Sequence, residues 1–563
     1  MSESVEKRDE LLTALDKLGE GSKLLWLVFT LTLTPTVLNG LQSMSYVFTT
    51  EIPPYWCSVP ELVSANWTSE QIRIIASAGE CTKYDYDYTY LAQVGYEEAV
   101  KYVEGLSNEP PSSSCSAFIY GDVGRSTVVQ EWDLVCTRAA DRANTFMAFS
   151  LGKLMGSGLF GVYADKHGRR RTFIIGIVLQ ILSGPASAVV PWFWGFMALR
   201  WITGLSSAAV GYSSLTILTE VSGSRHRQWL GIAFNAGYPA GTAILVGLAH
   251  QFREWRSLQM AISVGSLLLV IHAWLMPESP RWLITQNRRN EAQKIIEKYY
   301  GPISTAPALR STPPDQQNNK QNDIHGEKNK NFIRGNMKSL GILFSNSELR
   351  KRLLIMYVSW LTSSLSYYAI ALNVDNFTDD RYLYVLIMGF TEIPAYIVPS
   401  IVLIFLGRRT AGALLYILGA VCLLCILGIP QGSTSAIMGV ALTGRFTLSA
   451  VYGIVILYTS ELFPTVVRNS AVGTSCVMAH VGTIIAPYVS DLLGSVAWWA
   501  PSTICGSLAL VTGVLCLVLP ETSGRHLADT VEEETGDGRE STSFKRCFKC
   551  YSGGLTLAEA SNY

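Results

Sequence analysis

Charged residues are scarce in this sequence. Only 16% of the 563 residues are Asp, Glu, Lys or Arg, whereas a soluble domain usually carries about 25%. The first 22 residues are polar and charged, with no apolar stretch before a small-residue cleavage site, so we expect no cleavable signal peptide. The chain also lacks a Walker A loop, a nucleophile elbow and a paired metal motif. We therefore expect neither an enzyme nor an ATP-driven pump, with no cofactor, no metal and no nucleic-acid partner.

The apolar residues, 49% of the chain, gather in runs of about 20, the length at which a helix crosses the hydrocarbon core of a bilayer. Gly and Pro interrupt several runs, which membrane helices tolerate when neighbouring groups satisfy the freed backbone. We therefore predict an all-α protein of the lipid bilayer. The twelve predicted spans are 24–48, 143–164, 172–191, 193–220, 229–251, 257–276, 352–373, 382–406, 410–429, 434–460, 470–493 and 496–519.

Three charged motifs occur twice at nearly constant spacing, each at the end of an apolar run. The pairs are Gly168-Arg169-Arg170 with Gly407-Arg408-Arg409, Thr219-Glu220 with Ser460-Glu461, and Pro277-Glu278-Ser279 with Pro520-Glu521-Thr522, separated by 239, 241 and 243 residues. A duplicated hydrophobic half is typical of a two-lobed membrane transporter. We predict an N-terminal half over 24–276, a linker over 277–351 and a C-terminal half over 352–519.

Basic residues set the expected orientation. The short loops with Arg169, Arg225, Arg408 and Arg468 fall on one side of the alternation, and the positive-inside rule makes that side cytoplasmic. The segments 1–23 and 520–563, and the linker, then lie in the cytoplasm of a multi-pass plasma-membrane protein. The middle of the linker, from Pro313 to Lys330, has few large apolar residues and is expected to be disordered. Its flanks, Glu291 to Tyr299 and Ser339 to Arg352, are expected to be amphipathic helices.

The loop over 49–142 falls outside and is long enough to form a small domain. Its four cysteines, Cys57, Cys81, Cys115 and Cys136, predict two disulfides, with three possible pairings. Asn66-Trp67-Thr68 is a glycosylation sequon. The loop holds fourteen acidic and six basic residues, which either keep the domain soluble or enrich cations near the pore mouth.

The loop from Gly161 to Arg170 resembles the G-x-x-x-D-[RK]-x-G-[RK]-[RK] motif of the major facilitator superfamily. An Asp at a helix end can bridge to arginines in one conformation and release them in another. A copy in each half favours such a conformational switch over a plain cytoplasmic anchor. The expected switch residues are Asp165, Arg169, Arg170, Glu220, Arg408, Glu461 and Arg468.

Longer matches narrow the resemblance. Glu131-Trp132-Asp133-Leu134-Val135-Cys136, the segment from Pro277 to Leu283 and the segment from Glu461 to Asn469 resemble the organic cation, anion and zwitterion transporters of that superfamily. Among these the chain is most similar to the organic cation transporter-like proteins. The resemblance implies twelve transmembrane helices in two pseudo-symmetric six-helix halves, with a disulfide-bonded extracellular domain between helices 1 and 2. It also implies a central site that opens alternately to each side.

The resemblance also suggests the residues of that site. Charged residues inside membrane spans are costly and so mark function, and Glu392 matches the acidic position of cation-type members. Trp360 and Tyr367 match aromatic positions, and aromatic faces beside a carboxylate suit a substituted ammonium ion. The other expected contributors are Tyr452, Tyr238, Asn235 and Asn39.

His480 departs from the pattern of the family, which tends to have Asp there in cation transporters and Arg in anion transporters. Tyr396 stands where anion transporters have Lys. A neutral imidazole suits a zwitterion or an amine, and an unperturbed His titrates near pH 6.5, which predicts pH-sensitive uptake. We therefore expect a polyspecific transporter of small organic cations, amines or zwitterions. The alternatives are a transporter of organic anions or sugar-like solutes, and a non-transporting amine receptor.

Overall fold

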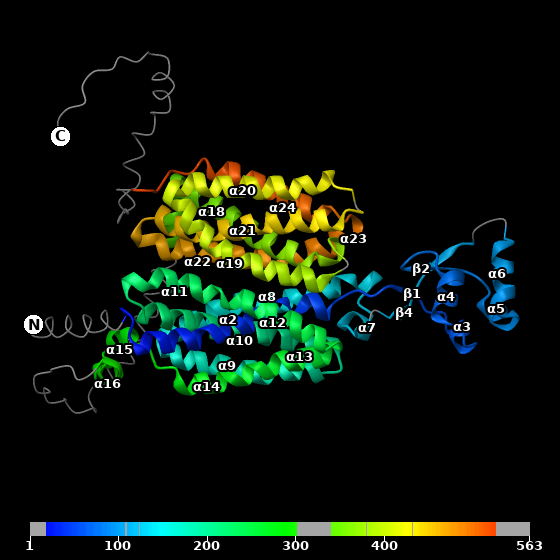
Figure 1. The fold of residues 1–563 in the computed structure, drawn as a ribbon, viewed down its shortest axis with the longest axis horizontal. Coiled ribbons are helices and arrows are strands. Elements are labelled where there is room, and N and C mark those ends of the chain that lie inside the picture. Colours follow the sequence, from blue (N-terminus) through cyan, green and yellow to red (C-terminus); the bar gives the residue numbers. More distant parts are fainter. Residues whose placement is uncertain are drawn as a thin grey trace, which may run out of the picture.

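The computed structural model describes residues 19–106, 110–122, 124–300, 339–378, 380–430 and 432–524. Figure 1 shows two helical bundles packed along their lengths, with a small domain at one end and the helices α15 and α16 at the other. The expectations for residues 1–18, for the disordered middle of the linker and for the tail beyond 524 lie outside the described residues.

The first bundle contains six spanning elements of the N-terminal half. Gly152 and Gly204 lie where the second and fourth of these elements cross, and a Cβ on either would collide with the backbone of the facing helix, so only glycine permits this approach. The elements are α2 (Lys23–Thr49), α8 (Ala139–His167), α9 (Arg169–Val189), α10 (Phe193–Val221), α11 (Ser224–Asn235) with α12 (Gly237–Gln251), and α13 (Trp255–Val264) with η2 (Gly265–Leu267) and α14 (Leu268–Leu275).

The second bundle repeats this arrangement with the C-terminal half. Its elements are α18 (Ser347–Leu372) with η4 (Val374–Asn376), α19 (Arg381–Phe405), α20 (Arg408–Cys425) with η5 (Ile426–Gly428), α21 (Thr434–Leu462), α22 (Thr465–Tyr488) with the π-helical η6 (Val489–Leu493) and α23 (Gly494–Val496), and α24 (Ala500–Cys516). The twelve-helix arrangement predicted from the sequence is therefore present.

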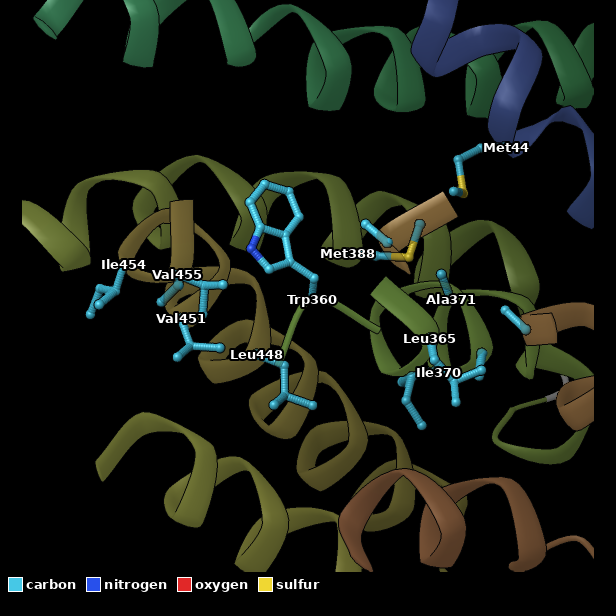
Figure 2. Close-up of a cluster of buried hydrophobic side chains, with 14 of the residues drawn as sticks. Met44, Trp360, Leu365, Ile370, Ala371, Met388, Leu448, Val451, Ile454 and Val455 are labelled. Carbon is cyan, nitrogen blue, oxygen red and sulfur yellow. The ribbon is translucent and has the colours of Figure 1, made fainter. Parts of the chain in front are cut away.

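Ten of the described helices are long and apolar enough to cross a membrane. The two other elements of the bundles are α24, which has 17 residues, and α10, whose buried face is rich in Ser and Thr. One buried apolar cluster runs through both bundles. It includes Met44 of α2 and Met388 of α19, which come from different halves and are both drawn in Figure 2. Within a bilayer, contacts of this kind are stabilised by close van der Waals packing rather than by removal of apolar surface from water.

Residues 50–138, here called the disulfide domain, connect α2 to α8. Strand β1 (Tyr55–Cys57) pairs antiparallel with β4 (Phe118–Tyr120), and β2 (Thr82–Tyr84) pairs antiparallel with β3 (Ser112–Ser114). Around them lie the helices α3 (Pro60–Ser64), α4 (Ser69–Ala76), α5 (Tyr88–Val94) and α6 (Tyr96–Glu104). Disulfides join Cys57 to Cys115 and Cys81 to Cys136, which selects one of the three pairings left open by the sequence.

Asn66 is exposed and lies between α3 and α4, in the left-handed backbone region at φ 59°. A side chain in this position is accessible to a modifying enzyme, so glycosylation of the sequon stays a prediction that the geometry permits.

The helix α7 (Val128–Trp132) and the 3-10 turn η1 (Cys136–Arg138) fasten the disulfide domain to the end of the N-terminal bundle. The ring of Trp132 packs 5.4 Å from that of Trp255, centre to centre. The carboxylate of Glu131 accepts a hydrogen bond from Trp255 Nε1 at 2.8 Å and forms an ion pair with Arg256. The Glu-Trp-Asp segment singled out in the sequence is thus an anchor between domain and bundle.

At the opposite end lie α15 (Pro280–Thr285) and α16 (Arg289–Tyr300), which carries the first expected amphipathic helix. The second expected helix, Ser339 to Arg352, is wrong as a single element. Residues 339–345 are helical, but the chain bends at Asn346, whose side chain accepts hydrogen bonds from the backbone N–H groups of Glu348 and Leu349. This N-cap starts α18, so the last part of the expected helix belongs to a spanning element.

Candidate functional site

A cavity of about 400 Å³ lies between the two halves. This volume is in the range of small-molecule sites, about 300–1,000 Å³. The wall contains residues of α2, α8, α10, α11 and α12 from one half and of α18, α19, α21 and α22 from the other. Seven of the eight residues predicted to bind substrate are in the wall: Asn39, Asn235, Tyr238, Tyr367, Glu392, Tyr452 and His480.

Glu392 is buried in the C-terminal side of the wall and is satisfied by three donors. The hydroxyl groups of Tyr367 and Tyr396 both donate to Oε1, the latter at 2.8 Å. Arg445 Nη2 donates to Oε2 at 3.3 Å, and the guanidinium carbon lies 4.1 Å from the centre of the Tyr367 ring. The side chains of Glu392 and Arg445 are each 1% exposed. Glu392 is therefore one partner of a buried ion pair, and this cluster has no net charge.

Sequence reasoning missed Arg445, although a signal was available. Arg200 and Arg445 are 245 residues apart, close to the spacing of the three repeated motifs. Arg445 is thus the C-terminal copy of an arginine that also occurs in the fourth element of the N-terminal half. Its pairing with Glu392 depends on the contact of α21 with α19, which the order of residues does not reveal.

Sequence reasoning also missed a basic group in the N-terminal side of the wall. Lys153 Nζ donates to Asn39 Oδ1 at 2.9 Å, and Ser207 Oγ donates to the same oxygen at 3.2 Å. The ammonium nitrogen of Lys153 lies 5.2 Å from the centre of the Phe149 ring. The rule that charged residues in spans mark function would have found Lys153, since it falls inside the predicted span 143–164.

His480 and Tyr212 meet across the two halves. The Nε2 of His480, on α22, lies 3.4 Å from the hydroxyl oxygen of Tyr212, on α10, and both residues line the cavity. The imidazole therefore has a neutral hydrogen-bond partner and contacts the cavity, and its effect on the pH dependence of uptake stays a prediction.

Trp360 is the exception among the predicted binding residues, because it is not in the cavity wall. Its Nε1 donates to Thr459 Oγ1 at 2.9 Å, and its ring packs edge-on against Tyr452, with centres 5.5 Å apart. It belongs to the buried apolar cluster that also contains Val451 and Val455 of α21 (Figure 2). Trp360 supports Tyr452 from behind, and Tyr452 rather than Trp360 faces the cavity.

The expected switch residues of the N-terminal half meet at the α15 end. Arg169 Nη2 lies 3.0 Å from both Asp165 Oδ1 and Glu220 Oε1. The carboxylate of Glu278 accepts the backbone N–H groups of Arg169 and Arg170, at 2.9 and 3.1 Å, and so caps the N-terminus of α9. Gly168 has φ +106°, and a Cβ there would overlap this carboxylate. These contacts explain why Gly-Arg-Arg and Pro-Glu-Ser occur together.

The corresponding motifs of the C-terminal half make the same kinds of contact. Arg408 Nε lies 3.1 Å from Glu461 Oε2, and Glu521 Oε1 accepts the backbone N–H of Arg408 at 2.8 Å. Arg468 Nε donates to the carbonyl of Phe463 at 3.3 Å, and the role of Arg468 in the switch stays a prediction. The ion pairs formed by Arg169 and Arg408 each join residues of a single half.

At the disulfide-domain end, by contrast, ion pairs cross between the halves. Arg142 of α8 lies 2.9 Å from Asp375 Oδ2 and 3.7 Å from Asp491 Oδ2 of the C-terminal half. Arg381 of α19 lies 2.9 Å from Glu51 Oε1 of the N-terminal half and 3.1 Å from Asp375 Oδ1. We call these five residues the gate cluster. Their contacts join the two halves at this end of the bundles.

Comparisons with known proteins agree with this architecture. The profile of the "Sugar (and other) transporter" family matches residues 72–533. An organic cation transporter protein of Drosophila melanogaster is 30% identical over 548 residues, 94% of this chain and 95% of that protein. Solute carrier family 22 member 13 of Homo sapiens is 34% identical over 403 residues, 72% of this chain and 70% of that protein. Organic anion transporter 3 of Sus scrofa is 30% identical over 419 residues, 74% and 75% of the two chains.

Among solved structures, the xylose transporter XylE from E. coli, in a partially occluded inward open conformation, has a TM-score of 0.58 at 14% identity. The match covers 90% of this chain and 100% of that one. At this identity the match shows a shared fold.

Proposed function

The chain belongs to the sugar (and other) transporter family of the major facilitator superfamily, and we propose that it moves small organic amines or zwitterions by alternating access. It is a multi-pass membrane transporter of the solute carrier family 22 type, and it is not an enzyme. Its substrates are small organic solutes. The finer proposal concerns the substrate class and the place of the protein in the cell.

The observation that carries the proposal is the Glu392 cluster in the wall of the central cavity. The carboxylate oxygens and the hydroxyl oxygens of Tyr367 and Tyr396 have lone pairs beyond those used within the cluster. An ammonium group has only donors, so it matches this set of acceptors. The nearby rings of Tyr452 and Tyr238 also line the cavity and offer faces to a cation.

Arg445 limits how strongly this cluster attracts a positive charge. Because Arg445 neutralises Glu392, an amine gains hydrogen bonds there but little net Coulomb attraction. A permanently charged cation without donors gains less than a primary or secondary amine. The cluster therefore favours an amine or a zwitterion over a strongly cationic substrate.

We also propose the orientation expected from the sequence, with both termini in the cytoplasm of a plasma-membrane protein. The basic loops of the repeated motifs lie at the α15 end, where Trp282 Nε1 donates to the carbonyl of Asp165 at 3.0 Å. The disulfide domain lies at the other end (Figure 1). Disulfides persist in oxidising compartments, which supports an extracellular position for this domain.

An organic anion transporter is the second candidate, because Lys153 brings a positive charge into the wall of the cavity. An amine-binding receptor differs from both in that it would bind the solute without accumulating it.

The test is uptake of a radiolabelled amine into proteoliposomes that contain the purified protein. Glu392→Gln should lower the apparent affinity about tenfold or more, the worth of a hydrogen bond to a charged group. Glu348→Gln is the matched control, since Glu348 is 60% exposed in the first turn of α18 and lies outside the cavity wall. Unchanged affinity in Glu392→Gln would overturn the assignment of the amine site. Binding that does not scale with vesicle volume would instead indicate a receptor.

A further inference from the structure

The N-terminal side of the cavity wall contains a group of hydrogen-bond donors, here called the Lys153 pole: Lys153, Asn39 and Ser207. An ammonium group can only donate, so the Asn39 atom that faces it must be the carbonyl oxygen, and this oxygen also accepts from Ser207. Two of the three N–H bonds of Lys153 remain for other partners. The Asn39 amide nitrogen has no partner among the described residues. The pole therefore presents donors and a positive charge to the cavity.

The charge of the Lys153 pole is not balanced by the protein. Arg142, Arg169 and Arg445 each have a carboxylate at ion-pair distance. Within the part of the chain that the structure describes, no carboxylate is at that distance from Lys153 or from its neighbour Arg200. A buried or half-buried cation without a counter-ion is costly, so a partner from outside the protein would complete this site.

Arg200 adds a second positive charge that has no carboxylate partner among the described residues. It is 3% exposed, and its guanidinium carbon lies 5.0 Å from the centre of the Phe149 ring, the ring that Lys153 also contacts. Its repeat partner Arg445 faces Glu392 in the C-terminal half. The repeated arginine is therefore neutralised by a carboxylate in the C-terminal half, whereas its counterpart in the N-terminal half keeps its positive charge.

We propose that the Lys153 pole binds an acid group of the substrate, so that the transported solute has a carboxylate or a similar anion at the end that faces the N-terminal half. This inference rests on the proposed function and narrows its substrate class. A zwitterion places its anion at Lys153 and its amine at Glu392, so both poles of the cavity are satisfied. A solute with only a cation leaves Lys153 unpaired and is repelled by it.

The experiment compares three solutes of nearly the same size and shape in proteoliposomes. The first is 4-(methylamino)butanoate, which has both charges and a secondary ammonium group that can donate hydrogen bonds. The second is its primary amide, which keeps the cation and loses the acid. The third is the carbon isostere, in which a carbon replaces the ammonium nitrogen, so that only the acid remains. Uptake of each is measured for the wild-type protein, Lys153→Gln and Lys153→Arg.

We expect Lys153→Gln to raise the KM for the butanoate and for the carbon isostere about tenfold or more, the effect of losing a charged hydrogen bond. The KM for the amide should stay the same or fall, because a repelling charge has been removed. Lys153→Arg keeps the charge and should restore much of the affinity for both acids. Retained uptake of the amide by Lys153→Gln shows that the variant is folded.

An equal change for all three solutes would overturn the assignment, because it would show that Lys153 acts on the structure rather than on the acid group. Transport of the carbon isostere alone, with the dependence on Lys153 intact, would support the Lys153 pole and refute the amine site. If the wild-type protein transports none of the three, the readout is protection against thermal unfolding by the butanoate. Protection that disappears in Lys153→Gln supports the pole, and no protection of the wild-type protein refutes it.

Discussion

Replacing Arg142 by Gln should open the end of the cavity nearest the disulfide domain. The side chain of Arg142 is 8% exposed and holds Asp375 and Asp491 of the other half. Without it, Asp491, whose side chain is 5% exposed, is buried without a cation. Separation of the halves would return this carboxylate to water, so the substitution penalises the closed conformation.

The structure also sets the size of the effect. Removing one partner of a buried ion pair costs about 3–5 kcal/mol. Asp375 is 33% exposed and keeps Arg381 at 3.1 Å, so we take the lower end, about 3 kcal/mol, or roughly a hundredfold change in the conformational equilibrium.

Spin labels at Trp192 and Val496 report the opening, because both residues are exposed and lie in different halves, Trp192 just before α10 and Val496 at the end of α23. In Arg142→Gln, the distance distribution measured by pulsed electron paramagnetic resonance should shift to longer distances. Arg138→Gln is the control, since Arg138 pairs with Asp141 of its own half at 3.2 Å.

A double variant provides the sharper test of the same reasoning. Adding Asp491→Asn to Arg142→Gln removes the orphaned carboxylate, so it should restore part of the closed population. If Arg142→Gln leaves the distances unchanged, or if Arg138→Gln changes them equally, the gate cluster does not control closure.

Three further substitutions test other parts of the structure. Glu220→Gln should slow the transport rate about tenfold and leave the substrate Kd unchanged. Asp165→Asn should slow the transport rate less, because the Asp165 side chain is 67% exposed and exposed ion pairs contribute about 0–1 kcal/mol. Equal effects of the two variants on the rate in stopped-flow transport assays would refute this ranking. Tyr452→Ala should weaken substrate binding in an equilibrium binding assay, and Trp360→Phe should not. A larger loss of affinity in Trp360→Phe than in Tyr452→Ala would place Trp360 in the site. Cys57→Ser should destabilise the disulfide domain by about 2–4 kcal/mol. Non-reducing thermal scans should show this as a lower unfolding temperature. An unchanged unfolding temperature would count against a stabilising role of this disulfide.

The fold could be predicted from the sequence because the strongest signals in the sequence are local. Apolar runs of spanning length and charged motifs at helix ends do not depend on which helices pack together. The repeat spacing then implied two halves, and the contacts of Glu278 and Glu521 show why the motifs come in sets, since each carboxylate caps a helix that begins with Gly-Arg-Arg.

Contacts between helices were harder to predict, because residues far apart in the chain meet there. Arg142 and Asp491 are separated by 349 residues, and nothing along the chain marks them as partners. Trp360 and Tyr367 share one face of α18, but the cavity covers only part of that face, because Tyr452 of α21 lies in front of Trp360. Helical periodicity places a side chain on a face without saying which neighbour covers it.

Alternating access requires that one cavity between the two halves binds the substrate and opens to each side in turn. Cys476 of α22 lines this cavity and is a free cysteine, so it can report access in a variant whose other free cysteines are replaced. An impermeant thiol reagent is applied to right-side-out and to inside-out vesicles, with and without 4-(methylamino)butanoate. We expect labelling of Cys476 from both sides of the membrane, slowed by the solute in both cases. Labelling from one side only, or at a rate that the solute does not change, would contradict it.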